Sequence, residues 1–546
     1  MTSLQYTHIF TGAGCLTVCC LMLCAECLNL FQGVGYRARE YFPRLSGARI
    51  KRAAVLSAAA AAGLLLVDAL AAGTAYGLLG LAVLAAVAAV GVARAPVPQK
   101  TPTVATRRLK RLMIAFAVVA YALGTGVLWA GFALLPRFPT VLFGAALGLY
   151  IVVLPAAGWL TAPLEACIRR KFARDARKKV ESCHALKVIG VTGSYGKTSV
   201  KNILYDILKR KFRVLMSPAS YNTPMGLCRT VNERLTAGHE VFIAEMGARR
   251  RGDIKALCKL FPPDASVVTA VGGAHLATFG SRAGVLAAKG EIVTYAKEGA
   301  FCVFSADTAG SVRLHELCPR EKLLAGSRGD VQAHNVRCDE KGGVFLLTFG
   351  GLITVEIKTL LLGVHNASNI ALAAAVAWRL GMTPTEIADA ARGICPVPHR
   401  LQLLPSAMRD LTIIDDSYNA CPESAAAAFA VVSLFACQKA VITPGLVEQG
   451  AGEGAANVRL GKEIAAVFDL AFPVGRHAGK LVEGLLTGGM PVGRIFSCAT
   501  VDEAVKRLAE VRGDKRTVVL FENDLPDSYR PDAGRGLGAF TAHTRS

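Results

Sequence analysis

The chain changes its hydrophobic pattern once, near residue 186. Before that point, long and nearly unbroken apolar runs alternate with basic stretches; after it, short apolar runs alternate with amphipathic helical stretches. A membrane-crossing helix needs about 20 apolar residues, whereas a buried parallel strand is a short apolar run. The pattern therefore predicts an α-helical transmembrane N-terminal domain followed by two α/β domains.

Several segments before residue 164 are apolar enough to span a bilayer. They are residues 8–31, 53–72, 75–94, 113–136 and 139–163. The second and third are so rich in alanine that four spans remain an alternative to five. With five spans, the basic stretches at 32–52, 95–112 and 165–185 lie on one side, which the positive-inside rule makes cytoplasmic. We expect a multi-pass plasma-membrane protein whose later domains face the cytoplasm.

The formal net charge of +22 raises nucleic-acid binding as an alternative, because Lys and Arg neutralise phosphates. Many of these cations lie between the apolar runs, so membrane topology explains the charge better and we expect no nucleic-acid partner. The cysteines outside the first span lie in a region expected to face the reducing cytoplasm. Glu26 and Asp68 are acids in or near spans and are therefore functional candidates.

The part after residue 186 contains two series of predicted strands. The first series is "LKVIGVTG", "EVFIAEMG", "ASVVTAVG" and "AFCVFSAD", and the second is "LTIIDDSYN", "KAVITPG", "LAFPVG" and "TVVLFEN". Helical stretches separate the strands in both series, which is typical of parallel sheets. We divide the chain into a membrane domain (1–164), a basic juxtamembrane linker (165–185), a central domain (186–395) and a C-terminal domain (396–546).

The string "GVTGSYGKTS" follows the first of these strands and predicts a phosphate-binding loop. Its candidate phosphate-binding residues are Gly193, Ser194, Gly196, Lys197, Thr198 and Ser199. The glycines let backbone amides approach phosphate oxygens, and the next helix presents its positive N-terminal end. Lys197 would reach the β- and γ-phosphates and Thr198 would ligate magnesium. The strict P-loop spacing has glycine at position 191, where this chain has Val191.

The form T-G-x-x-G-K-T/S after an apolar strand resembles the loop of the Mur ligases. Further motifs follow in that family's order, over about residues 186 to 530: "SYNTPMG", "FIAEMGARRRGDI", "AHLATFGS", "AAKGEI", "GVHNASNIALAAA", "PHRLQ" and "DDSYNACPES". By this resemblance the chain is identified as a member of the Mur ligase family, with a P-loop-type central domain and a Rossmann-like C-terminal domain. "DDSYNA" and the "AHL" to "AKGEI" run are most similar to the branch that adds D-alanyl-D-alanine.

The resemblance implies an ATP- and Mg²⁺-dependent ligase of peptidoglycan precursor synthesis. In this reaction ATP phosphorylates a substrate carboxylate, and an incoming amine attacks the acyl phosphate to form an amide. The implied partners are a muropeptide or a lipid-linked wall precursor, and an amino acid or dipeptide acceptor. Two alternatives stay open: a ligase of the same superfamily that acts on folate or a poly-amino acid, and a membrane transporter driven by an ATPase.

The resemblance also implies roles for single residues. Lys197, His275 and Lys289 match catalytic positions, and Thr198, Glu245, His275 and Lys289 match magnesium ligands. Lys289 aligns with a lysine that relatives carbamylate, a modification that requires a neutral amine. The alternatives are a structural glutamate at 245, a hydrogen-bonded histidine at 275 and a surface salt bridge for Lys289.

Four further positions match residues that contact ATP in the family. Asn222 matches an asparagine near the phosphates, and Asn369, Arg400 and Asp416 match residues that contact ATP when the C-terminal domain closes. The alternatives are a helix cap for Asn369 and a surface ion pair between Arg400 and Asp416.

The chain departs from the family pattern in two regions. Membrane spans replace the soluble N-terminal domain that grips the UDP of the substrate in such ligases. In the C-terminal domain, "VITPGLVEQG" stands where the family has "GDM-x-ELG", and "FENDLPDSY" stands where "KGS" is expected. D-alanyl-D-alanine is therefore a provisional acceptor, whereas ATP-driven amide formation is the firmer prediction.

Overall fold

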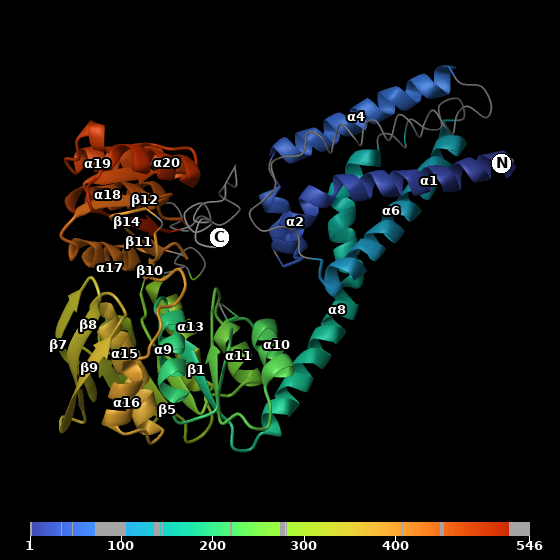
Figure 1. The fold of residues 1–546 in the computed structure, drawn as a ribbon. Helices are drawn as coiled ribbons and strands as arrows, with labels where there is room; N and C mark the ends of the chain where they lie inside the picture. Colours follow the sequence, from blue (N-terminus) through green and yellow to red (C-terminus); the bar gives the residue numbers. More distant parts are fainter. Residues whose placement is uncertain are drawn as a thin grey trace. The chain divides into compact units, whose positions relative to one another are not determined.

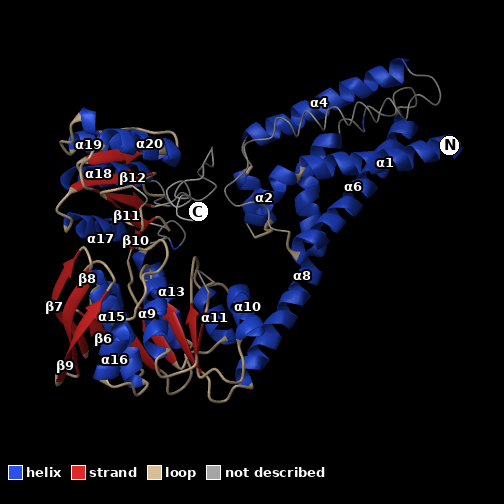
Figure 2. Ribbon diagram, viewed as in Figure 1, coloured by secondary structure: helices blue, strands red, loops and turns tan. Residues whose placement is uncertain are grey.

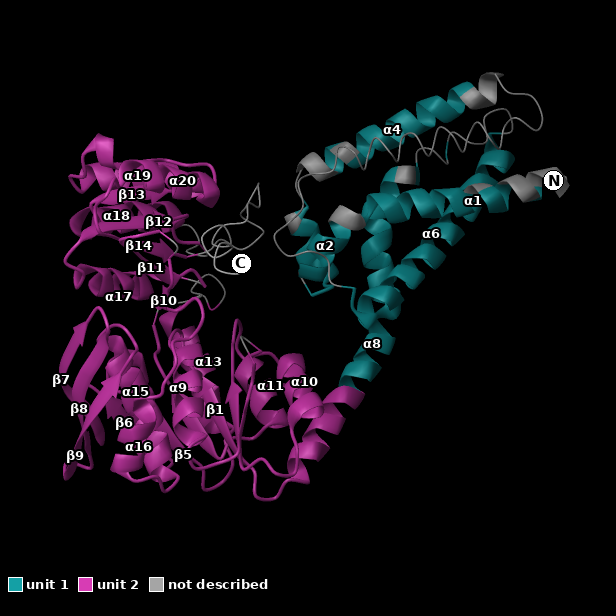
Figure 3. Cartoon of the chain, viewed as in Figure 1, with its two compact units in different colours: residues 1–170 teal, residues 171–546 magenta. Residues whose placement is uncertain are grey.

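The computed structural model divides the chain into two compact units, Met1–Arg170 and Lys171–Ser546 (Figure 3). It describes residues 3–33, 35–45, 47–70, 105–135, 142, 146–218, 221–272, 279, 281–406, 408–418, 420–447 and 452–523. The first unit is helical and the second contains the α/β part of the chain (Figure 2).

The described part of the first unit is built from helices. They are α1 (Ser3–Leu23), α2 (Ala25–Gly33), α3 (Ala38–Tyr41), α4 (Gly47–Leu70), α6 (Arg107–Leu134) and the first part of α8 (Tyr150–Glu181), with 3₁₀ turns η1 (Phe42–Arg44) and η2 (Leu147–Leu149). α1 packs along α6, and Leu16, Phe116 and Leu128 are buried in the core that they share (Figure 1). An ion pair of 2.6 Å between Arg111 Nε and Glu165 Oε1 ties the start of α6 to α8.

Two of the described helices, α6 and α8, are long and apolar enough to cross a membrane. A third candidate is the pair Ile9–Leu23 and Cys27–Gly33, which is bent by 59°. Large apolar side chains such as Trp129 and Trp159 are exposed on α6 and α8, as expected of a surface that meets lipid.

The predicted number of spans stays a prediction. The predicted span 75–94 lies outside the described residues, as does most of 139–145, and the side chains of Glu26 and Asp68 are also not described. The described residues contain one shorter apolar helix, Ala53–Leu66, inside the predicted span 53–72.

The central domain contains a nine-stranded sheet among the described residues, in the order β2-β3-β1-β4-β5-β6-β7-β8-β9. Its strands are β1 (Lys187–Thr192), β2 (Val214–Met216), β3 (Val241–Glu245), β4 (Ala265–Val268), β5 (Phe301–Ser305), β6 (Lys322–Gly326), β7 (Val331–Asp339), β8 (Gly342–Phe349) and β9 (Ile353–Thr359). Neighbours are parallel from β2 to β7, and the last three strands are antiparallel. The four strands predicted here are β1, β3, β4 and β5, and they are confirmed.

Helices cover both faces of this sheet (Figure 2). They are α9 (Lys197–Leu208), α15 (His365–Arg379) and α16 (Pro384–Ala391) on one face, and α10 (Pro224–Arg234), α11 (Asp253–Leu260), α13 (Arg282–Thr294) and α14 (Ala309–Leu317) on the other. Because β1 lies between two strands and between two helical layers, its residues from Val188 to Thr192 are all buried. This double burial explains why "VIGVT" is an unbroken run with little polarity.

The C-terminal domain contains a five-stranded sheet in the order β10-β11-β14-β12-β13. Its elements are β10 (Gln402–Leu404), β11 (Leu411–Asp416), α17 (Pro422–Ser433), β12 (Gln438–Thr443), α18 (Glu453–Val467), β13 (Leu470–Pro473), η4 (Gly475–His477), α19 (Ala478–Thr487), η5 (Val492–Arg494), α20 (Val501–Val511) and β14 (Thr517–Glu522). The four predicted strands β11 to β14 are confirmed and are mutually parallel, and β10 adds an antiparallel edge. α17, α18 and α19 pack on one face and α20 on the other.

Candidate active site

The loop between β1 and α9 has a backbone that requires glycine at two positions. A Cβ at Gly193 would collide with the Thr269 hydroxyl, and Gly196 adopts φ +78° at the N-cap of α9. The loop is tied to the segment after β4, because the Ser194 amide donates to the Ala270 carbonyl at 2.6 Å and the Thr269 hydroxyl donates to the Tyr195 carbonyl at 2.5 Å. The loop is therefore held in one shape by its own chain.

The Lys197 side chain folds back onto the backbone of this loop. Its ammonium donates to the Gly193 carbonyl at 2.9 Å and to the Ser194 carbonyl at 3.3 Å, and burial lowers its pKa. α9, which begins at Lys197, directs its free N–H groups and the positive end of its dipole to the same place. A glycine loop, a lysine and a helix N-terminus are the parts from which phosphate-binding sites are built in proteins.

Three side chains converge on Glu245, the last residue of β3, which is 1% exposed. The Thr198 hydroxyl donates to Oε2 at 3.0 Å, the Lys201 ammonium lies 3.2 Å from Oε2, and the Asn222 amide donates to Oε1 at 3.2 Å. The carboxylate is thus fixed beside the phosphate loop by donors from α9 and from the segment before α10. A carboxylate next to a threonine hydroxyl suits Mg²⁺, which is bound by few protein ligands together with phosphate and water.

Lys289 lies on α13 and is 2% exposed, so the surface salt bridge considered for it is wrong. Burial, and then the nearby charge of Lys197, lower the pKa of Lys289 to about 7. A large share of this amine is therefore neutral near neutral pH. His275 lies outside the described residues, and the described residues contain no group of three or more His, Cys, Asp or Glu that could hold a metal ion.

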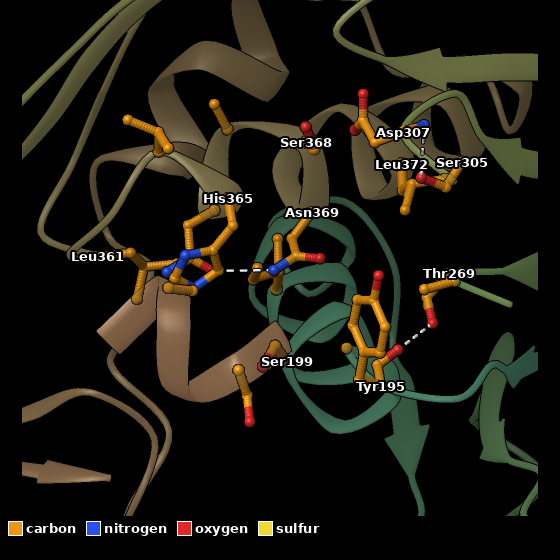
Figure 4. A pocket seen from close by; sticks show the side chains of 18 of the residues that line it. Tyr195, Ser199, Thr269, Ser305, Asp307, Leu361, His365, Ser368, Asn369 and Leu372 are labelled. Atoms are coloured by element: carbon orange, nitrogen blue, oxygen red, sulfur yellow. Dashed lines mark hydrogen bonds between the residues drawn. The ribbon is translucent and has the colours of Figure 1, made fainter. Parts of the chain in front are cut away.

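A cavity of about 490 Å³ lies between the central and C-terminal domains of the second unit. Five predicted nucleotide-contacting residues border it, namely Gly196, Ser199, Asn369, Arg400 and Asp416. Figure 4 shows Tyr195 and Thr269 along one part of its wall, with Asn369 and His365 along another. Its volume is that of a site for a small organic ligand.

Each of the three side chains Asn369, Arg400 and Asp416 at the border of the cavity has its own contact with the protein. The Asn369 amide donates to Asn366 Oδ1 at 3.0 Å, so the helix-cap alternative is wrong: α15 has Val364 at its N-cap. The Arg400 guanidinium lies 4.5 Å from the centre of the Tyr418 ring. Asp416 Oδ1 accepts the Leu401 amide at 3.2 Å, and burial raises the pKa of Asp416 to about 6.

The ion pair considered between Arg400 and Asp416 does not form among the described residues. Two further residues of the site, Lys201 and Tyr195, were not predicted from the sequence. Lys201 had a signal, because it follows Lys197 by one helical turn and so shares its face of α9. The sequence contains no comparable signal for Tyr195, since the position of its side chain depends on the loop geometry.

Comparison with known proteins places this arrangement in a family. A model of the Mur ligase middle domain matches residues 191–377. A protein of Mycobacterium bovis named UDP-N-acetylmuramoyl-tripeptide–D-alanyl-D-alanine ligase is 30% identical over 369 residues, which are 65% of this chain and 72% of that protein. The chain belongs to the Mur ligase family.

A further relative and a solved structure also match the chain. A Bacillus subtilis protein with the same name as the mycobacterial protein is 31% identical over 303 residues. These residues are 55% of this chain and 65% of the Bacillus subtilis protein. The crystal structure of MurF ligase from Thermotoga maritima in complex with ADP has 28% identity and a TM-score of 0.59, and the match covers 66% of this chain and 81% of that one. The chain therefore spans about two thirds to four fifths of these relatives, and the family model leaves residues 1–190 unmatched.

Proposed function

We propose that this Mur ligase uses ATP to join the carboxyl group of a muropeptide to an amine in peptidoglycan precursor synthesis. The observation that carries the proposal is the convergence of Thr198 and Asn222 on Glu245 beside the phosphate loop. Glu245, the magnesium ligand that we propose, lies at the same sheet edge as Lys197, where the carboxyl ends of β1 and β3 meet.

The reaction runs in two steps. A carboxylate oxygen of the muropeptide attacks the γ-phosphorus of ATP, the bond to the β-phosphate oxygen breaks and ADP leaves. The amine then attacks the acyl carbon, inorganic phosphate leaves, and the nitrogen loses a proton. Loop amides and Lys197 stabilise the charge on the phosphates during the first step. Bound Mg²⁺ supplies further charge neutralisation, and Thr198 and Glu245 are the described residues that would hold it.

Lys289 fits the role of a carbamate. The ammonium would first lose one proton, and the neutral amine would then attack carbon dioxide, forming an N–C bond and releasing a second proton, so that a cationic side chain becomes anionic. Support comes from the burial of Lys289 and from its pKa of about 7, which leaves neutral amine available. The matching role of His275 remains an expectation from the sequence.

The remaining predicted residues fit contacts with the nucleotide. Asn222 positions the Glu245 carboxylate through its amide. Asn369, Arg400 and Asp416 border the cavity that Gly196 and Ser199 reach from α9, and we propose that they contact ATP there. The Arg400 guanidinium, stacked on Tyr418, is the cation best placed to meet phosphate from the C-terminal side.

We further propose that the N-terminal unit anchors the enzyme to the plasma membrane with its α/β domains in the cytoplasm. The membrane-length helices α6 and α8 support this, as do the basic stretches that flank them. An anchored ligase meets UDP-linked and lipid-linked muropeptides alike, so both belong among its candidate substrates. The relatives' name makes D-alanyl-D-alanine the first acceptor to test.

The test is ADP release by detergent-solubilised full-length protein. UDP-linked and lipid-linked muropeptides are supplied one at a time, each with and without D-alanyl-D-alanine. We expect ADP release to depend on one muropeptide, and a product with one new amide bond by mass spectrometry. ADP release at the same rate with and without every muropeptide would contradict the proposal and favour an ATPase of another kind.

A further inference from the structure

The first turn of α6 and the middle of α8 carry a group of arginines that the ligase reaction does not use. Arg111 Nε lies 2.6 Å from Glu165 Oε1, and Arg108 Nε lies 3.8 Å from Glu165 Oε2. Arg169 follows Glu165 by one turn of α8 and is close enough to repel Arg108 electrostatically. Arg108, Arg111 and Arg169 together form the arginine cluster.

The cluster carries more positive charge than the described residues around it balance. Glu165 is 4% exposed and is the carboxylate that contacts both Arg108 and Arg111. Three guanidinium groups around one carboxylate leave an excess of two positive charges. Arg111 and Arg169 both repel Arg108, and like charges held close together are unfavourable. One arginine would be enough to pair with Glu165, so the excess charge indicates an anion from outside the chain.

Arg108 is held in position by a tyrosine with an unusual backbone conformation. The guanidinium carbon of Arg108 lies 4.0 Å from the centre of the Tyr36 ring. Tyr36 has φ +64°, in the left-handed region that bulky residues rarely adopt, and its amide donates to the Phe31 carbonyl at 2.8 Å. The Gln32 side-chain amide donates to the Tyr36 hydroxyl at 3.2 Å. Strain of this kind persists where the surrounding structure fixes it, and it is concentrated at functional sites.

The guanidinium groups can be reached by a ligand. The side chains of Arg108 and Arg111 are each 31% exposed, and Arg169 is exposed. Arginine presents its donors in a planar fork that binds two oxygens of a phosphate at once. A phosphate monoester carries a charge of about −1.5 to −2 at pH 7, which matches the excess positive charge of the cluster.

The position of the cluster suits a lipid headgroup. It lies just outside the apolar segments of α6 and α8, on the side where the basic stretches lie. Leu160, Leu164 and Ile168 are exposed and lie four residues apart on α8, so they form an apolar stripe that ends beside Arg169. An acyl chain can lie along such a stripe, and basic pockets between membrane helices on the cytoplasmic side bind lipid headgroups.

We infer that the arginine cluster binds a membrane lipid whose phosphate is a monoester. The inference goes beyond the ligase reaction, and it rests on the proposed anchoring of the N-terminal unit in the membrane. The three guanidinium groups hold the phosphate oxygens, and the apolar stripe of α8 contacts an acyl chain. A phosphate diester offers one negative charge and fewer free oxygens, so the site prefers the monoester.

The experiment is native mass spectrometry of detergent-solubilised full-length protein with short-chain lipids. Equal amounts of dioctanoyl phosphatidic acid, phosphatidylglycerol and phosphatidylcholine compete in one sample. For the wild type we expect about tenfold more bound phosphatidic acid than either other lipid, as one additional charge-assisted hydrogen bond implies. Arg108→Gln and Arg169→Gln should each lose this preference. Because Arg169 is exposed, Arg169→Gln should fold like the wild type.

Two controls separate a lipid site from a generally basic surface. Lys110 is exposed on the same turn of α6, so Lys110→Gln removes one positive charge from outside the cluster and should keep the preference. Glycerol 3-phosphate has the same phosphate group and no acyl chain, so it should displace phosphatidic acid about tenfold less well than the unlabelled lipid does.

Three results would overturn the inference. The first is equal binding of phosphatidic acid and phosphatidylglycerol by the wild type. The second is a preference that Arg169→Gln keeps, or that Lys110→Gln loses to the same extent. The third is equally good displacement by glycerol 3-phosphate, which would leave a phosphate site without a role for the lipid chain.

Cell fractionation and the ADP-release assay keep these outcomes apart from the proposed function. A chain that alkaline carbonate releases from membranes is not anchored, and the lipid site then falls with the anchoring. A chain that stays in the membrane and needs a muropeptide for ADP release, but shows no lipid preference, contradicts the lipid site alone. A lipid preference without muropeptide-dependent ADP release supports the lipid site and contradicts the ligase.

Discussion

Two buried glutamates end parallel strands in the two α/β domains, and their surroundings differ. Glu245 ends β3 in the central domain and is contacted by Thr198, Lys201 and Asn222. Glu522 ends β14 in the C-terminal domain and has no hydrogen-bond partner among the described residues. Both are at most 1% exposed, so burial alone does not distinguish them.

The difference shows which of the two carboxyl groups the chain holds in place by itself. Around Glu245 the protein supplies the donors that hold the carboxylate, so the phosphate end is formed before any substrate arrives. Around Glu522 the protein supplies burial and a second acid, Asp416, and no hydrogen-bond donor among the described residues. Preorganised charge at the reacting phosphate contributes most to this kind of catalysis, and the surroundings of Glu245 would supply it.

The largest expected effect is that of Lys197→Ala, which tests whether the phosphate loop takes part in the reaction. We expect ADP formation to fall about a thousandfold, because a charge aimed at the transferring phosphate is lost. Circular dichroism should show an unchanged fold. Lys187→Ala, at the exposed opposite end of β1, is the matched control and should retain activity. Normal turnover by Lys197→Ala would remove the phosphate loop from the mechanism.

Glu245→Ala and Glu522→Gln should shift stability in opposite directions. The first leaves the ammonium of Lys201, which is 1% exposed, without the Glu245 carboxylate, and breaking such a buried pair costs about 3–5 kcal/mol. Adding Lys201→Met to Glu245→Ala should restore much of the stability but no activity. Urea unfolding of these three variants and the wild type measures the changes. Destabilisation by Glu522→Gln would show that the two glutamates do not differ as described.

Lys289→Ala should reduce turnover, and short carboxylic acids should partly restore it. Acetate or propionate can occupy the vacated space and supply the anion that a carbamate would provide. Because the pKa of Lys289 is about 7, the neutral amine that carbon dioxide requires is abundant above pH 7 and is lost as the pH falls below it. Depleting bicarbonate should therefore slow the wild type most at acidic pH. Near-normal activity of Lys289→Ala would exclude Lys289 as a required metal ligand.

The last prediction concerns the membrane topology of the chain, and its test does not change the enzyme's activity. Cys395 is exposed in the second unit. A membrane-impermeant maleimide should label it only after cells are permeabilised, and Cys395→Ser should remove the labelled peptide detected by mass spectrometry. Labelling of Cys395 in intact cells would place the α/β domains outside, where a supply of ATP cannot be assumed.

The parallel strands could be predicted from the sequence because burial on both faces leaves an unbroken apolar run. β1 and β14 are examples, each with at least five buried residues in succession. The hairpins β7 to β9 were not predicted, since their mixed burial gives no such run. The first span agrees in position with a bent helix pair, but a hydropathy pattern contains no signal for the bend.

For the site, the sequence indicated the loop and Glu245 through spacing and resemblance. It did not indicate that Lys201 contacts Glu245, because that contact needs the register of β1 against β3. It also did not show that Lys289 is buried, since "AAKGEI" reads equally well as a surface turn of helix. The lack of a hydrogen-bond partner for Glu522 among the described residues could not be predicted from the sequence. It depends on the hydrogen bonds of Asn523 and on the stacking of Arg400 on Tyr418.

The central claim is that the phosphate loop drives amide formation, and coupled product analysis tests it most directly. Full-length protein, ATP, Mg²⁺, a muropeptide and an amine are combined, and ADP and amide product are counted in the same sample. The account predicts one amide for each ADP in the wild type and neither product in Lys197→Ala. ADP released without any amide, whatever muropeptide and amine are supplied, would contradict it.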